Sequence, residues 1–187
     1  IGNGAFNACT NLSLTELPSS IQSIGSQAFS SCTKLAITEL PDGITEIPNE
    51  TFKNCTKMNL TKLPTNLTKI NTSAFYGCSS MTLSTLPDTI SSIGGTAFYG
   101  CTKLSITKLP TSLTSLTTSV FSLCTSIKKL MFPNIVSITA TSIYNSPFYN
   151  CTGLKKVWFG SSITSAGFAR YTFATCKVLE KIYIDLP

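Results

Sequence analysis

The residues of this chain that could take part in the widest range of chemistry are its eight cysteines. The first six are spaced by 23 positions, and the last two gaps are 27 and 25. Equivalent positions in a repeat carry parallel Cα–Cβ bonds, whereas a disulfide needs two that converge and zinc needs four converging ligands. Because free cysteine packs as a small apolar residue, we expect eight free, buried thiols, no metal site and no cofactor. The cysteines are Cys9, Cys32, Cys55, Cys78, Cys101, Cys124, Cys151 and Cys176.

Eight carboxylates are the other candidates for catalysis, because the chain has no histidine and so lacks the commonest general base. Glu16 and Glu39 occupy equivalent positions of adjacent units, and Asp42, Glu46 and Glu50 lie close together in the sequence. Paired carboxylates can act as acid and base, but this pattern is more typical of a solvated surface. A nucleophilic cysteine needs exposure and a basic neighbour, and eight equivalent cysteines indicate a scaffold. We predict no catalytic residue and a protein that is not an enzyme.

Three further columns of residues keep the register of the cysteines, which indicates an internal repeat. Phenylalanine precedes every cysteine by three positions, a large aliphatic residue follows by three, and proline follows the first six by nine. One such unit cannot bury its own apolar side, so successive units must stack and align each column as a ladder. The phenylalanines are Phe6, Phe29, Phe52, Phe75, Phe98, Phe121, Phe148 and Phe173, and the prolines are Pro18, Pro41, Pro64, Pro87, Pro110 and Pro133.

These columns resemble the BspA-type leucine-rich repeats of microbial surface proteins, and the segment from Ile24 to Leu35, IGSQAFSSCTKL, is a full example. The resemblance implies a right-handed leucine-rich-repeat solenoid, with a parallel β-sheet on one face and turns or short helical pieces on the other. It also implies a cell-surface setting and a role in adhesion or recognition. Residues 1–187 are expected to form a single array of about eight units, incomplete at both ends. The units are regular over residues 1–123 and longer and irregular over 124–187.

Each strand is expected to end at the proline, which has no N–H to donate within a sheet. We number positions from the cysteine of each unit. The family pattern has apolar residues at +6 and +8, as in Leu130 and Phe132. The first five units instead carry a hydroxyl residue at +6 and an aliphatic one at +5: Leu14, Ile37, Leu60, Leu83 and Ile106. Strand neighbours point to opposite faces. Two interpretations follow. Either these five aliphatic residues form an exposed adhesive stripe, or the backbone bulges and turns them inward. The free energy gained by burying apolar side chains favours the second.

The units from Cys124 onward change character, with an insertion around Thr139 to Pro147. Residues 89–179 hold eight basic residues and no acidic ones, whereas residues 1–88 hold five basic and six acidic. Lys128 and Lys155 lie beside a set of lysines and large side chains that should face outward on the sheet. This set is Lys129, Met131, Lys156, Trp158, Lys181 and Tyr183. Either these residues bind an anionic partner, with the aromatic rings as anchors, or the lysines keep a terminal sheet soluble.

The function that follows is a protein-recognition or adhesion module of a secreted or cell-surface protein, binding a host, matrix or surface protein through the sheet face. The alternative is a structural spacer or self-assembly element without a specific ligand, so self-association stays open. Arginine, the preferred reader of base edges, occurs only at Arg170, so nucleic acid is not expected as a partner. The sequence has no run of about 18 apolar residues, so we predict no membrane span. Only 12% of residues are charged, which is compatible with an extracellular or cell-surface location.

Overall fold

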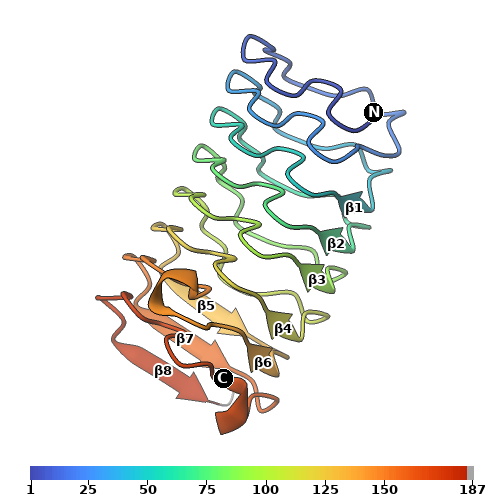
Figure 1. Ribbon diagram of the computed structural model, residues 1–187. Helices are drawn as coiled ribbons and strands as arrows, with labels where there is room; N and C mark the ends of the chain where they lie inside the picture. The colour runs from blue at the N-terminus through green and yellow to red at the C-terminus, as the bar shows by residue number, and fades with distance from the viewer. Residues whose placement is uncertain (185–187) are drawn as a thin grey trace.

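The structure, a computed structural model that describes residues 1–184, is a parallel β-solenoid with little helix. Successive coils stack along one axis, with the N-terminus at one end and the C-terminal strand at the other (Figure 1). Each coil hydrogen-bonds to its neighbours through the backbone, so that residues about 23 positions apart lie side by side. The leucine-rich-repeat solenoid predicted from the sequence is confirmed.

One row of short strands runs along an edge of the solenoid, in the segments that follow the prolines (Figure 1). These strands pair in parallel as β1-β2-β3 and β4-β6, and each has one exposed and one buried residue. Turns or short helical pieces were expected in these segments, so the pairing there is a difference from the prediction. The strands are β1 (Glu46–Ile47), β2 (Lys69–Ile70), β3 (Ser92–Ile93), β4 (Ser115–Leu116) and β6 (Ser137–Ile138).

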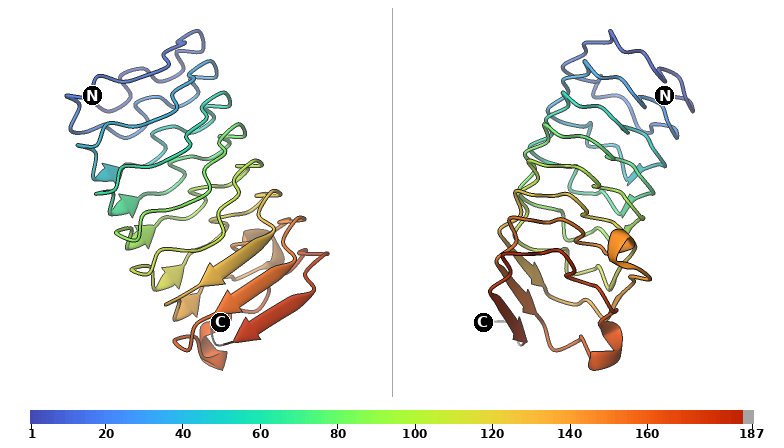
Figure 2. Two further views of the ribbon diagram at one scale, coloured as in Figure 1. Left: turned by 180° about the vertical axis from the view of Figure 1, so that it is seen from behind. Right: turned by 60° about the vertical axis from the view of Figure 1, so that its left-hand side comes forward.

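A second, more regular sheet is confined to the last three units, where its strands occupy positions +5 to +8 (Figure 2). Its strands β5 (Lys129–Phe132), β7 (Lys156–Phe159) and β8 (Lys181–Ile184) pair in parallel in the order β5-β7-β8. As expected, β5 ends directly before Pro133. The insertion holds the 3-10 helix η1 (Ile143–Asn145), and the following unit holds η2 (Ser165–Gly167).

The alternation of inward and outward side chains explains why this sheet stops at β5. In the Cys55 unit, Met58, Leu60 and Leu63 are buried while Thr61 and Lys62 are both exposed. Two consecutive outward residues at +6 and +7 break the period of two that a strand requires. In the Cys124 and Cys151 units the outward pair moves to +4 and +5, which leaves side chains that alternate over the four positions of a strand. Within residues 1–184, the first five units therefore have no four-residue strand before the proline.

The same pattern decides between the two interpretations of the shifted aliphatic residues. Ile37, Leu60, Leu83 and Ile106 have no exposed surface, and the hydroxyl residues that follow them are exposed. The interpretation in which these side chains turn inward is confirmed for those four units. Leu14 is 40% exposed, because it lies in the first coil and no coil of the described chain covers its outer side, so its exposure does not decide between the two interpretations.

The phenylalanine column forms a continuous stack through the middle of the solenoid. Successive rings from Phe6 to Phe148 have centroids 5.2 to 5.8 Å apart and are nearly parallel. The six phenylalanines of this column from Phe29 to Phe148 are fully buried. Each ring is covered by the rings of two neighbouring coils, so burial depends on stacking rather than on contacts within one unit.

Each coil also makes a tight turn just before its cysteine, at a residue with positive φ. Glycine occupies this position twice, at Gly77 (φ 72°) and Gly100 (φ 71°). The other units place ordinary residues there, including Asn54 (φ 58°) and Leu123 (φ 62°). The left-handed conformation costs a non-glycine residue about 1–2 kcal/mol, so the stacked coils must compensate for this strain.

The register can be tested by a pair of substitutions at adjacent positions. We expect Leu60→Ala to lower the free energy of unfolding by about 2–5 kcal/mol, because it opens a cavity in a fully packed core. Thr61→Ala removes an exposed side chain and is expected to change the stability by less than about 0.5 kcal/mol. Urea unfolding followed by circular dichroism measures both. Equal losses, or a larger loss at Thr61, would show that the assigned register is wrong.

Candidate binding surface

The sheet β5-β7-β8 brings together all six residues that the sequence singles out as a candidate binding site. In its register Lys129 pairs with Lys156 and Lys156 with Lys181, while Met131 pairs with Trp158 and Trp158 with Tyr183. The residues between them in β5 and β7 are buried, so the two rows share the outer face. The lysines thus form one row and the large side chains a second row beside it.

The row of large side chains is held by contacts within the protein. The rings of Trp158 and Tyr183 stack with centroids 5.1 Å apart and planes 8° from parallel. Met131 is half-buried and its N–H donates to the carbonyl of Thr107 at 2.9 Å. Tyr183 is 36% exposed, so one edge of this row remains open to solvent.

A shallow groove of about 460 Å³ follows the lysine row on one side of the sheet. Lys128 and Lys129 come from one coil, and Lys155 and Lys156 from the next. The Lys155 N–H donates to the Lys128 carbonyl at 2.8 Å, so the two pairs lie on adjacent, hydrogen-bonded segments. The lysines were identifiable from the sequence, but the hydroxyl residues that complete the groove were not, because Ser and Thr are common throughout the chain. These are Ser105, Thr107 and Ser126.

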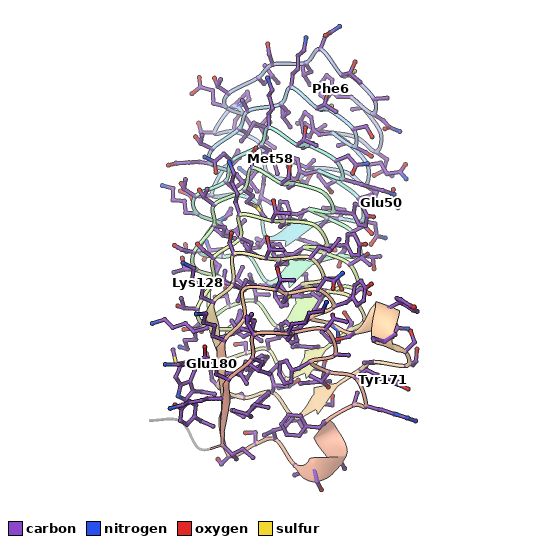
Figure 3. The ribbon with its side chains drawn as sticks, turned by 90° about the vertical axis from the view of Figure 1, so that its left-hand side faces the viewer. Phe6, Glu50, Met58, Lys128, Tyr171 and Glu180 are labelled. Carbon is purple, nitrogen blue, oxygen red and sulfur yellow. The ribbon has the colours of Figure 1, made fainter. Side chains whose placement is uncertain are left out.

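The groove lies on one side of the solenoid, and the acidic Glu50 lies on the other. Figure 3 shows Lys128 and Glu180 on one side of the coil stack, with Glu50 and Tyr171 on the opposite side. Glu180 lies beside the groove lysines, with its Oε1 3.9 Å from the Lys155 Nζ. Among residues 1–184, no carboxylate lies within 4.0 Å of the ammonium group of Lys128, Lys129 or Lys156.

Comparison with known proteins identifies the repeat. The family described as the BspA type leucine rich repeat region matches in six copies, over residues 1–83 and 68–186. The chain belongs to the BspA-type leucine-rich repeat family. Membership of this family supports the coarser statement that the chain is a protein-interaction or surface module.

Two solved structures of bacterial proteins show the same fold. A leucine-rich repeat protein from Bacteroides ovatus ATCC 8483 has 22% identity and a TM-score of 0.61, with 99% of this chain and 66% of that chain covered. The T. pallidum leucine-rich repeat protein has 34% identity and a TM-score of 0.61, with 70% and 61% covered. The chain thus spans slightly less than two thirds of the length of either protein. No curated protein sequence matches it significantly.

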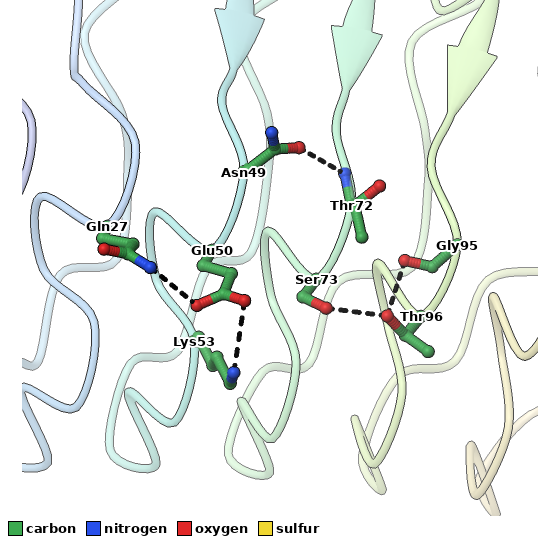
Figure 4. A network of polar contacts seen from close by, with 8 residues as sticks. All are labelled: Gln27, Asn49, Glu50, Lys53, Thr72, Ser73, Gly95 and Thr96. Atoms are coloured by element: carbon green, nitrogen blue, oxygen red, sulfur yellow. Dashed lines mark hydrogen bonds and ion pairs between the residues drawn. The ribbon is translucent and has the colours of Figure 1, made fainter.

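The BspA-type coils stabilise the face remote from the groove with side-chain ladders (Figure 4). Glu50 accepts a hydrogen bond from Gln27 at 3.1 Å and pairs with Lys53 at 3.3 Å. The Thr72 N–H donates to Asn49 Oδ1 at 3.1 Å. Because the Gln27–Glu50 and Thr72–Asn49 hydrogen bonds join neighbouring coils, we interpret these residues as structural.

Of the five carboxylates considered for catalysis, three line one shallow groove of the BspA-type array, and Glu46 and Glu50 do not line it. Glu16, Glu39, Asp42 and Lys62 line a shallow groove of about 350 Å³, where Glu39 pairs with Lys62 at 3.0 Å. The Glu46 carboxylate instead accepts a hydrogen bond from the Asn71 side-chain amide. No group of three or more potential metal ligands occurs among residues 1–184. In the same range, no helix has the length and apolar character needed to cross a bilayer.

The cysteines form a second interior column of the BspA-type repeat. Each thiol from Cys32 to Cys176 donates to the carbonyl of a phenylalanine in the preceding coil, at 3.0 to 3.3 Å. These seven are buried, as predicted, whereas the prediction is wrong for Cys9, which is exposed. Cys9 lies in the first coil, so no coil of the described chain covers it. Burial raises the pKa of Cys55 and of Cys176 to about 12.

Thiol reactivity should therefore separate Cys9 from the others. At pH 8 we expect iodoacetamide to modify one thiol rapidly in the native protein, because thiolate is the reactive species and burial raises the pKa of the other seven. Mass spectrometry of the alkylated protein gives the number and position of the adducts. Unfolding in guanidinium serves as the control and should expose all eight cysteines. Rapid modification of Cys78 or Cys101 without denaturant would contradict the assigned burial.

Proposed function

We propose that this chain is a recognition module of a secreted or cell-surface protein and that it binds a protein partner through the outer face of β5, β7 and β8. The observation that carries the proposal is the pair of parallel rows on that face, one of lysines and one of large side chains. The family supports the coarser statement, because its members are interaction or surface modules. The partners considered are host, matrix or surface proteins.

The two rows would have different roles in binding: the aromatic rings would supply binding energy, and the lysines would attract the partner. Trp and Tyr are enriched among the residues that contribute most to binding energy, and Trp158 and Tyr183 are already stacked. An ordered side chain loses little rotamer entropy when a partner binds. Lys129 and Lys156 lie in a stretch of 91 residues, 89–179, that has eight basic and no acidic residues, and Lys181 lies just beyond it. The three lysines would steer an anionic partner toward the face.

An extracellular or cell-surface location is part of the proposal. The chain takes its polar surface mainly from serine and threonine and has only 12% charged residues, a composition that suits an exported protein. Cys55 and Cys176, with pKa values raised to about 12, are poorly reactive toward oxidants because the thiolate is the reactive form. The buried column can therefore remain reduced in an oxidising environment.

Charge reversal of the lysine row tests the proposal. We expect the triple variant Lys129→Glu, Lys156→Glu and Lys181→Glu to lose about tenfold or more in affinity for a partner, because like charges across an interface are repulsive. The readout is binding of the purified chain to an extracellular-matrix preparation and to cell surfaces, measured by surface plasmon resonance and flow cytometry.

The matched control reverses three lysines of the early coils, Lys34, Lys57 and Lys69, which changes the net charge equally. It should bind like the wild type if the face is specific. A wild-type chain that binds none of these preparations would contradict the proposal. Concentration-dependent association in sedimentation velocity, without any such binding, would favour the alternative of a self-assembling spacer.

A further inference from the structure

The groove beside the lysine row differs electrostatically from the rest of the solenoid surface. On the early coils, two lysines are paired with carboxylates of a neighbouring coil, Lys62 with Glu39 at 3.0 Å and Lys108 with Asp88 at 3.7 Å. The groove places four lysines on two adjacent coils with one carboxylate near the rim, at 3.9 Å from Lys155. The positive charge here is concentrated and largely uncompensated by the part of the chain that the structure describes.

The backbone fixes how densely this charge is packed. Lys129 is directly opposite Lys156 in the parallel ladder, and adjacent strands lie about 4.8 Å apart. Each coil contributes two lysines because +4 and +5 both point outward. Four ammonium groups in so small an area repel one another, so a multivalent anion that bridges the two coils would relieve a repulsion present in the free protein.

The chemistry of the residues that line the groove indicates which class of ligand would fit it. Most of its exposed wall is hydrocarbon; four of the residues that line it are lysines, which have long alkyl stems, and Ser105, Thr107 and Ser126 have hydroxyl groups. Such a wall can pack against the C–H face of a sugar ring while the hydroxyls form hydrogen bonds with it. Lysine is a compact point charge rather than a planar fork, so it suits a tetrahedral sulfate as well as it suits a carboxylate.

Two other polyanions match the groove less well. An extended acidic peptide places side chains of one face about 6.7 Å apart, so its charges are sparser than the lysines. A single-stranded nucleic acid has phosphates of suitable density, but its bases need aromatic rings on which to stack. The residues that line the groove include no aromatic side chain.

We propose that the groove of Lys128, Lys129, Lys155 and Lys156 binds a sulfated polysaccharide chain carried by the partner. The inference rests on the proposed function, since it specifies which part of the partner contacts the lysine side of the face. The ammonium groups bind sulfate oxygens, the lysine stems pack against the sugar rings, and the hydroxyls of Ser105, Thr107 and Ser126 bind sugar hydroxyls. The row of Trp158 and Tyr183 remains free to contact protein.

Heparin, a sulfated polysaccharide, is the probe for this groove. We expect the wild type to bind a heparin octasaccharide at 0.15 M salt with an affinity that falls steeply as salt rises, because binding releases counterions. Replacing the four groove lysines with glutamine should weaken binding about 30-fold or more and flatten the salt dependence. Isothermal titration calorimetry and elution from immobilised heparin measure both quantities.

Matched variants separate the groove from net charge. A control with Lys34→Gln, Lys57→Gln, Lys62→Gln and Lys69→Gln loses the same charge elsewhere and should keep its affinity within about threefold. A variant with arginine at the four groove positions should bind at least as tightly as the wild type, since the charge is retained. Circular dichroism confirms that each variant is folded.

Several outcomes would overturn the inference. These are a wild type that does not bind heparin at 0.15 M salt, equal losses in the groove and control variants, equal binding of desulfated heparin, and tighter binding of polyglutamate or single-stranded DNA of equal charge. Failure of this inference can be told apart from failure of the proposed function. If matrix binding persists after heparinase treatment and still depends on Lys181 and Trp158, the recognition face stands and the polysaccharide proposal fails.

Discussion

The structure depends on one constraint, which is that no coil can bury its own apolar residues. The ring of Phe75 is buried because Phe52 and Phe98 stack on its two faces, at 5.7 and 5.5 Å. The thiol of each buried cysteine likewise finds its hydrogen-bond acceptor in the preceding coil. The contacts that bury these two columns are thus made between neighbouring coils, as in other solenoids. Leu14 and Cys9 are exposed for this same reason, because the described chain has no coil beyond the first.

This constraint determines which features the sequence could predict. A side chain that must meet its own counterpart on the next coil recurs at a fixed interval, so the phenylalanine and cysteine columns were visible as repeats. The same logic placed Lys129, Lys156 and Lys181 in one row, and Met131, Trp158 and Tyr183 in another. In parallel strands of equal register, equal positions in successive units are direct neighbours. The composition of the candidate binding surface could therefore be read from spacing alone.

Features that depend on backbone conformation were harder to predict from the sequence. Left-handed residues precede each cysteine, but only Gly77 and Gly100 mark that position with glycine, while Leu123 adopts it against its intrinsic preference. The two-residue strands such as Glu46–Ile47 are too short for a period of two to be recognised. Ser105, Thr107 and Ser126 carry no distinguishing mark in a chain rich in Ser and Thr. In each case tertiary stacking, rather than local preference, decides the conformation.

A single shift in the pattern links the regular sheet to the charge of its surface. Both types of unit place three inward residues between +3 and +8, and both contain one pair of consecutive outward residues. In the Cys55 unit the outward pair is Thr61 and Lys62, which interrupts a strand; in the Cys124 unit it is Lys128 and Lys129, before the strand begins. Moving the pair by two positions therefore creates a flat ladder and also sets two lysines side by side at its edge. Because the buried columns supply the stability, these outward positions are free to vary, and the last three units use that freedom to build a surface unlike the rest of the array.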